Sequence, residues 1–191
     1  MFLIFDTETT GEPKNWKSPV SDLANWPRMV QIAWLQYDIS GKQIAERNYI
    51  VKPNGFTIPE DTVKIHGIST EQAINEGVEL KTALIDFSNA INESSYLVAH
   101  NMSFDANVIG AEFLRENVEN KLFETPQICT MESSTNFCKL QNRYGYKWPS
   151  LSELHLKLFK KGFDEAHNAA FDVKVCADCF FELKRKGVLK L

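Results

Sequence analysis

The chain begins with an apolar run that ends directly in two acids, and this feature constrains the fold more than any other. Residues 1–6, MFLIFD, predict a buried strand that starts at once. Side chains at positions i and i+2 of a strand point to the same face, so the carboxylates of Asp6 and Glu8 can reach one cation. Two acids this close repel each other without a counter-charge, which favours a bound metal. Taken alone, the pair is also explained by an exposed strand end with two solvated acids.

The rest of the chain alternates between strand and helix patterns. Periodicity and turn signals predict four more strands, at residues 29–37, 43–52, 95–99 and 125–130. They predict helices at residues 59–65, 70–76, 80–92, 101 or 103 to 117, 150–160 and 168–186. This order describes an α/β domain with a mixed sheet. Because no repeat or linker interrupts it, residues 1–191 are expected to form a single domain.

The composition is typical of a soluble globular protein. Hydrophobic residues make up 43% and charged residues 24% of the 191 residues. No apolar run approaches the roughly 20 residues that a membrane span needs. The N-terminus has neither the positive region nor the cleavage site of a signal peptide. We therefore expect a cytoplasmic protein with no membrane partner.

Charge is distributed unevenly along the chain. The net charge of −4 argues against a protein that binds nucleic acid through bulk electrostatics. Residues 139–161, however, hold six basic residues against one acid, Glu153, together with Tyr144, Tyr146 and Trp148. An acidic centre that binds cations, next to this basic and aromatic flank, would suit a phosphodiester substrate. The alternative for Tyr146 and Trp148 is that these side chains simply pack against the protein.

The four cysteines give little functional information. Cys176 and Cys179 have the C-x-x-C spacing, but they lie in the predicted terminal helix without the βαβ surroundings of a redox motif. Reduced thiols near a buried helix face are the leading interpretation. A zinc site that uses Cys129 and Cys138, or a redox pair, is the alternative.

Two further acids stand at helix starts, and a histidine precedes one of them. Asp105 follows the strand 95–99 into the first turn of a helix, and Asp172 lies near the start of the terminal helix, after His167. An acid in a first turn is also explained by the helix dipole, which stabilises it by about 0.3–1 kcal/mol. Four carboxylates from three places are nevertheless a stronger signal than any pair. They offer the oxygen ligands that Mg²⁺ or Mn²⁺ needs in a two-metal phosphoryl-transfer site, and the histidine can accept a proton.

Three segments of the chain resemble the exonuclease motifs of the DEDDh family. They are FDTETTG (5–11), AHNMSFD (99–105) and AHNAAFD (166–172), and IHGIS (65–69) resembles a further segment of the family. This is the DnaQ-like group that includes the proofreading epsilon subunit of bacterial DNA polymerase III. The resemblance spans nearly the whole chain. It implies an RNase H-like fold, with a five-stranded mixed sheet flanked by helices.

Carried over residue by residue, the resemblance implies a two-metal catalytic site. Asp6 would bridge two Mg²⁺ or Mn²⁺ ions, and Glu8 and Asp172 would complete the site of the ion that activates water. Asp105 would support the second ion, directly or through water. His167 would act as the general base that deprotonates the attacking water.

The resemblance also implies contacts with the substrate. Thr7 and Thr9 would lie near the terminal nucleotide, and Phe104 would stack on a base. His100 and Asn101 would either contact the substrate or serve the structure alone.

The segment 11–27 is longer than the corresponding link in many members of the family. It contains Trp16 and Trp26. Each of these side chains is either a packing anchor or part of a substrate platform. We expect the remaining histidines, His66 and His155, to be structural.

The implied activity is metal-dependent 3′→5′ hydrolysis of single-stranded DNA ends, which releases nucleoside 5′-monophosphates in proofreading or repair. One alternative is an exoribonuclease of the same family that trims RNA, because the sequence does not place the contacts that discriminate a 2′-hydroxyl. Another is a catalytically silent binding module, against which the complete acidic set argues. The expected partner is nucleic acid with a free 3′ end, DNA rather than RNA, and a DNA polymerase is a further candidate. Since no tail beyond Leu191 would bind a partner, a free-standing enzyme is favoured.

Overall fold

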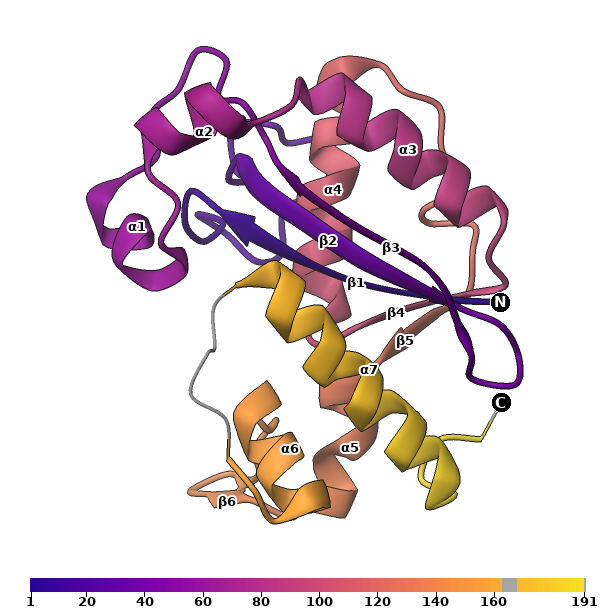
Figure 1. Ribbon diagram of the computed structural model, residues 1–191. Coiled ribbons are helices and arrows are strands. Elements are labelled where there is room, and N and C mark those ends of the chain that lie inside the picture. The colour runs from indigo at the N-terminus through magenta and orange to yellow at the C-terminus, as the bar shows by residue number, and fades with distance from the viewer. Residues whose placement is uncertain (163–167, 191) are drawn as a thin grey trace.

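A five-stranded sheet forms the centre of the molecule (Figure 1). The computed structural model describes residues 1–162 and 168–190. The strands, in the order β3-β2-β1-β4-β5, are β3 (Gln43–Ile50), β2 (Met29–Tyr37), β1 (Phe2–Thr9), β4 (Tyr96–Ala99) and β5 (Gln127–Cys129). β1 pairs antiparallel with β2 and parallel with β4, so the sheet is mixed. The expected α/β class and five-stranded mixed sheet are confirmed.

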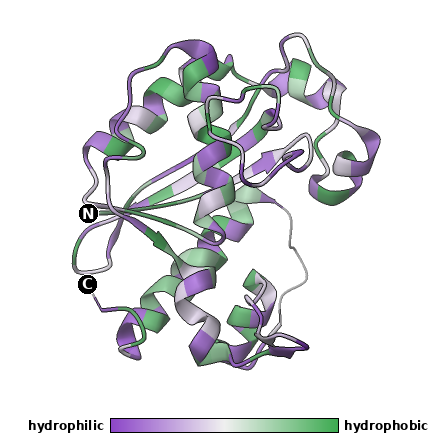
Figure 2. Cartoon of the chain, turned by 180° about the vertical axis from the view of Figure 1, so that it is seen from behind, coloured by the Kyte–Doolittle hydropathy of each residue, from purple (hydrophilic) through white to green (hydrophobic). Residues whose placement is uncertain are grey.

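Helices cover both faces of this sheet, which explains why the first strand is apolar throughout. The described residues contain α1 (Glu60–His66), α2 (Thr70–Glu76), α3 (Leu80–Asn92), α4 (Met102–Glu116), α5 (Thr130–Cys138), α6 (Leu151–Phe159) and α7 (Ala169–Arg185). Leu3 and Phe5 belong to the core shared with α3 and α4. Phe2 and Ile4 belong to the core shared with α7, on the opposite face (Figures 1 and 2). The alternation follows from the two-residue period of a strand.

The peripheral helices flank the sheet at two ends. α1 and α2 lie near the carboxyl end of β1, whereas α5 and α6 pack beside α7 (Figure 1). α6 begins with the predicted capping box, in which the side chain of Ser150 accepts from the backbone N–H of Glu153 and the Glu153 side chain accepts in return. None of the helices in the described ranges is long and apolar enough to span a membrane.

Two elements between β5 and α6 were not predicted. A strand was expected over residues 125–130, but β5 ends at Cys129 and α5 begins at the next residue. The sulfur of Cys129 accepts a hydrogen bond from the backbone N–H of Glu132 and so takes the place of the usual polar cap. A short hairpin follows, formed by β6 (Gln141–Asn142) and β7 (Gly145–Tyr146). Its two-residue strands are too short to show an alternating pattern.

The cysteines carry free thiols. Cys176 and Cys179 are buried on α7, and Cys138 is buried where α5, α6 and α7 meet. Burial is the first cause that raises the pKa of Cys179, to about 12, so this thiol stays protonated near neutral pH. The arrangement agrees with the interpretation of reduced thiols on a buried helix face.

Candidate active site

β1 continues past the end of β4, so its last residues are not paired with β4. The parallel pairing of the two strands reaches Ile4 opposite Val98, and β4 ends one residue later. On its other side β1 remains paired with β2, where Asp6 lies opposite Ala33. The chain that leaves β4 turns into α4 instead of continuing the sheet. The last residues of β1 therefore lie beside the N-terminal end of α4, at the carboxyl edge where α/β sheets commonly hold their ligands.

Three carboxylates converge at this edge. Oxygen atoms of Asp6, Glu8 and Asp172 lie within 4.8 Å of one another. Asp172 lies in the first turn of α7, whose N-terminus is capped by the side chain of Asn168. The backbone N–H of Ala169 donates to the side chain of Gln31 on β2 at 3.2 Å. This bond fixes the start of α7 against the sheet.

The electrostatics of the carboxylate cluster favour the binding of a cation. Burial first, and then the charges of Asp105, Glu8 and Asp172, raise the pKa of Asp6 well above its usual range. Burial, followed by the charges of Asp172 and Asp105, raises the pKa of Glu8 to about 8. Bound divalent cations would relieve this repulsion, and an all-oxygen donor set suits Mg²⁺ or Mn²⁺. The residues present therefore fit the metal ions that the sequence predicts.

Asp105 reaches the site from α4 and is held by Thr7. Its side chain is buried, and Oδ1 accepts from the backbone N–H of Thr7 at 3.1 Å and from the Thr7 hydroxyl at 2.7 Å. Burial raises the pKa of Asp105 to about 7, although the two bonds from Thr7 oppose the shift. The three-carboxylate group does not include Asp105. Its charge nevertheless acts on both Asp6 and Glu8.

The threonines of β1 have their hydroxyls engaged within the protein. Thr7 donates to Asp105, as described, and Thr9 donates to the backbone carbonyl of Gly11 at 2.6 Å. Gly11 has a φ of 139°, which a side chain would disfavour, so it permits the sharp turn after β1. Thr9 thus closes this turn, while Thr7 joins β1 to α4.

His100 lies directly after β4 with both ring nitrogens bonded inside the protein. Nδ1 lies 2.9 Å from the Thr130 hydroxyl, and Nε2 lies 3.0 Å from the carbonyl oxygen of Pro149. A carbonyl can only accept, so Nε2 carries the proton and Nδ1 accepts from Thr130. Burial lowers the pKa of His100 to about 4, which keeps the ring neutral. This placement favours a structural role over a contact with substrate.

Phe104 and Asn101 lie at the N-terminal end of α4, beside a second group of residues. The ring of Phe104 is 5.7 Å from the ring of Trp16, and Asn101 precedes the helix with a φ of 70°. Asn101 lines a hollow of about 450 Å³ together with Trp16, Ser103, Met131, Glu132 and Trp148. His167, expected to be the general base, lies outside the described residues.

The two tryptophans of the segment 11–27 differ in exposure. Trp26 is 3% exposed and its Nε1 donates to the carbonyl of Pro19, so it is a packing anchor. Trp16 is 50% exposed and faces the hollow beside α4. Met131 and Glu132 also line the hollow. No sequence signal pointed to them, because the helix that begins at Thr130 has an unusual cap.

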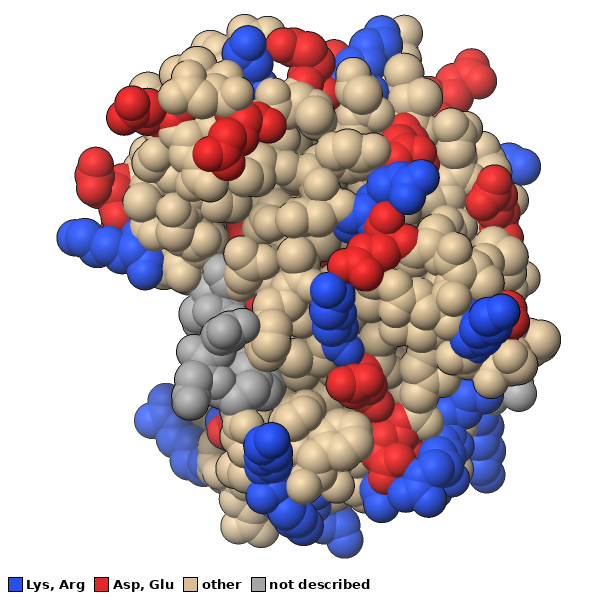
Figure 3. Space-filling model, viewed as in Figure 1, with Lys and Arg blue, Asp and Glu red and all other residues tan. Residues whose placement is uncertain are grey.

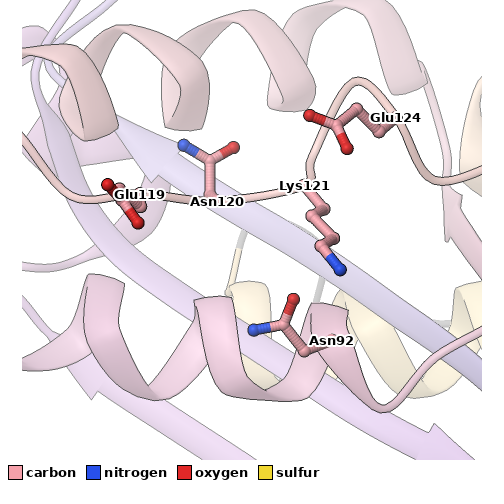
Figure 4. A pocket seen from close by; sticks show the side chains of 5 residues that line it. All are labelled: Asn92, Glu119, Asn120, Lys121 and Glu124. Atoms are coloured by element: carbon pink, nitrogen blue, oxygen red, sulfur yellow. The ribbon is translucent and has the colours of Figure 1, made fainter.

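Another surface hollow lies at the opposite end of α4. It is lined by Asn92, Glu119, Asn120, Lys121 and Glu124, and the Lys121 side chain points toward Asn92 (Figure 4). These residues belong to the end of α3 and the loop that follows α4. The carboxylate cluster, in contrast, lies at the start of α4. This hollow is therefore separate from the candidate active site.

Comparison with known proteins places the chain in a family. A family model described as exonuclease, RNase_T, matches residues 3–180. The chain belongs to this exonuclease family. The family expected from the three motifs is confirmed.

Two relatives with similar sequences are DNA polymerase III proteins. The DNA polymerase III subunit epsilon of Treponema pallidum is 29% identical over 94% of this chain and 74% of its own length. The PolC-type DNA polymerase III of Mycoplasmopsis pulmonis is 29% identical over 98% of this chain. The chain spans only 12% of the length of that polymerase.

Solved structures of E. coli exonuclease I share the fold. The complex with a dA16 oligonucleotide has a TM-score of 0.75 at 19% identity, and covers 96% of this chain and 40% of that protein. A zinc-bound complex with single-stranded DNA has a TM-score of 0.74 at 21% identity, and covers 97% and 40%. These likenesses confirm the RNase H-like fold.

Proposed function

We propose that residues 1–191 act as one metal-dependent 3′→5′ exonuclease domain that hydrolyses single-stranded DNA ends and releases nucleoside 5′-monophosphates. The observation that carries this proposal is the convergence of Asp6, Glu8 and Asp172 within 4.8 Å, with Asp105 beside them. A buried group of like charges is costly unless cations compensate it. Such a group at the carboxyl edge of a sheet suits phosphoryl transfer, in which the substrate and the transition state are both anionic.

The chemistry divides between the ions and the residues of the chain. Bound Mg²⁺ or Mn²⁺ ions would neutralise charge on the scissile phosphate and lower the pKa of the attacking water. Asp6, Glu8 and Asp172 would hold these ions, and Asp105 would support them from α4. The water oxygen forms a bond to phosphorus while the bond between phosphorus and the 3′ oxygen breaks, and the 3′ oxygen takes a proton from solvent to become the new 3′ hydroxyl of the shortened strand. On the strength of the third motif, we assign His167 to take the proton from the water.

The relatives support DNA as the substrate and a polymerase as a partner. The exonuclease I structures are described as complexes with single-stranded DNA, and the relatives are an epsilon subunit and PolC-type polymerases of DNA polymerase III. By analogy, we propose that this chain removes nucleotides from a DNA 3′ end and works with a DNA polymerase. RNA is the alternative substrate, and the same experiment tests it.

The decisive experiment is digestion of a 5′-labelled single-stranded DNA, and of an RNA of the same sequence, with Mg²⁺ or Mn²⁺. The expected result is a ladder that shortens from the 3′ end of the DNA, with none in EDTA and none with Asp6→Asn. Faster digestion of the RNA would reverse the assignment of the substrate. A ladder that persists in EDTA would contradict the metal mechanism.

The role of His167 has a separate test. His167→Ala should lose most of the hydrolysis rate and still bind the labelled DNA, because a general base acts in the chemical step. Undiminished turnover by this variant would remove His167 from the mechanism.

A further inference from the structure

Two exposed tryptophans face one hollow at the N-terminal end of α4. Trp16 and Trp148 are 50% and 62% exposed, although large apolar side chains are usually buried. Both line the hollow of about 450 Å³, a volume within the range of ligand-binding clefts. Met131 contributes a further apolar wall, and the polar groups come from Asn101, Ser103 and Glu132. We call this hollow the Trp16–Trp148 pocket.

The pocket lies beside the N-terminal end of α4, the helix that also carries Asp105. Asn101, which lines the pocket, is the residue that precedes α4, and Asp105 lies in the first turn of that helix. Phe104, the neighbour of Asp105, has its ring 5.7 Å from that of Trp16. Aromatic rings therefore lead from the residue beside the carboxylates to the pocket. If the 3′ end of a DNA strand binds at the carboxylates, the next nucleotides of that DNA would pass the pocket.

The backbone around Trp148 is anchored while its ring is exposed. The carbonyl of Pro149 accepts from His100, which lies directly after β4. On the other side, the backbone N–H of Lys147 donates to Leu140 at 2.8 Å, and the Lys147 ammonium pairs with Glu153 at 2.6 Å. The backbone on both sides of Trp148 is thus held in place, so binding at this residue costs less ordering entropy than binding at a loose loop.

The charges around the pocket suit a nucleic-acid strand with its base directed inward. The exposed side chains of Lys139 and Arg143 precede Trp148 in the chain, and basic side chains gather over α6 and the β6 hairpin (Figure 3). They would attract phosphates. Glu132 inside the pocket would repel a phosphate but accept from an N–H group on the Watson–Crick edge of a base. In a duplex that edge is already paired, so only an unpaired base can use it.

We propose that the Trp16–Trp148 pocket binds one unpaired nucleobase of the strand being degraded, on the 5′ side of the scissile linkage. This inference rests on the proposed function for the placement of the strand end. It names the substrate class of the site as single-stranded DNA, because the base must leave its partner to stack between the two tryptophans.

Binding can be measured without turnover, by the fluorescence anisotropy of a short 5′-labelled single-stranded DNA in EDTA. Trp148→Ala and Trp16→Ala are each expected to raise the Kd about tenfold, the loss typical of one stacked base. Trp148→Phe keeps a ring and should restore most of the affinity. Phe159→Ala is the matched control, since it removes a ring that is 39% exposed and does not line the pocket. A blunt duplex should bind more weakly to the wild type and lose little further affinity in Trp148→Ala.

The inference is overturned if neither tryptophan variant raises the Kd, if Phe159→Ala raises it equally, or if duplex binding falls as much as single-strand binding. A separate assay with a p-nitrophenyl ester of a nucleoside 5′-monophosphate and Mn²⁺ tests the proposed function alone, because this substrate has no neighbouring base. Binding that depends on the tryptophans, without hydrolysis of either substrate, would leave the pocket standing and reject the nuclease. Hydrolysis of these substrates, with a Kd that neither tryptophan variant changes, would support the nuclease and reject the pocket.

Discussion

The hydroxyl of Thr7 donates to Oδ1 of Asp105 at 2.7 Å, and the backbone N–H of Thr7 donates to the same oxygen at 3.1 Å. These two hydrogen bonds join β1, which carries Asp6 and Glu8, to the N-terminal end of α4. Because Thr7 lies between the two acids and points to the opposite face, one three-residue segment supplies two carboxylates and also positions a third.

Removal of the Thr7 hydroxyl should loosen Asp105. Thr7→Val keeps the shape and suits a strand, but Asp105 loses the shorter of its two hydrogen bonds. We expect about 1–2 kcal/mol lower free energy of unfolding, since the lost bond is buried and its acceptor is a carboxyl group. Urea denaturation measures this change. Thr7→Ser, which retains a hydroxyl, should lie close to the wild type, and a Thr7→Val protein as stable as Thr7→Ser would contradict the assignment.

Neutralising Asp6 should stabilise the metal-free protein and abolish its response to metal. In EDTA, Asp6→Asn replaces a carboxyl group whose ionised form is disfavoured first by burial and then by the charges of Asp105, Glu8 and Asp172. The melting temperature of this variant should therefore exceed that of the wild type without metal. Added Mn²⁺ should raise the melting temperature of the wild type and have little effect on Asp6→Asn. Asp61→Asn, at an exposed position of α1, is the control, and Mn²⁺ should raise its melting temperature by as much as that of the wild type.

His100 should make the fold sensitive to acid. Its folded-state pKa of about 4 lies below the value of about 6.5 in an unfolded chain, so the unfolded state binds the proton first as the pH falls. The stability linked to His100 is complete above about pH 6.5 and is lost progressively toward about pH 4, by about 2–3 kcal/mol. The free energy of unfolding, measured with urea at both ends of this pH window, should change less for His100→Gln than for the wild type. An equal dependence in both proteins would exclude His100 as the cause.

Glu112 should be essential for the packing of the segment 11–27. It is fully buried on α4, where Oε1 accepts from Arg28 at 2.9 Å and from the backbone N–H of Met29 at 2.9 Å, and lies 3.2 Å from Arg115. Arg115 in turn donates to the carbonyl oxygens of Leu23 and Trp26. Together these bonds tie the segment to α4.

Glu112→Ala leaves Arg115 largely buried without its partner, so we expect a loss of about 3–5 kcal/mol in the free energy of unfolding. Thermal or urea unfolding measures it. Glu124→Ala, at an exposed position of a loop, should change stability by less than about 0.5 kcal/mol. A loss in Glu112→Ala no larger than in this control would show that the buried network does not stabilise the segment.

Local pattern was enough to predict most of the elements. The apolar run before Asp6, the turn after β2 and the capping box at Ser150 are signals within a few residues, and each predicted element is found close to its expected bounds. α5 and the β6–β7 hairpin were missed for the same reason. Their signals are weak, because Cys129 is an unusual cap and the hairpin strands have two residues each.

The sequence by itself determined that Asp6 and Glu8 share one face of β1 while Thr7 takes the other, since a strand has a period of two residues. Only the tertiary structure decided that Asp172 meets both acids, that Thr7 holds Asp105, and that His100 supports the backbone beside Trp148. These contacts join segments that lie far apart in the chain. Periodicity shows which side of an element is buried, but the packing of the whole core selects the partner that covers it.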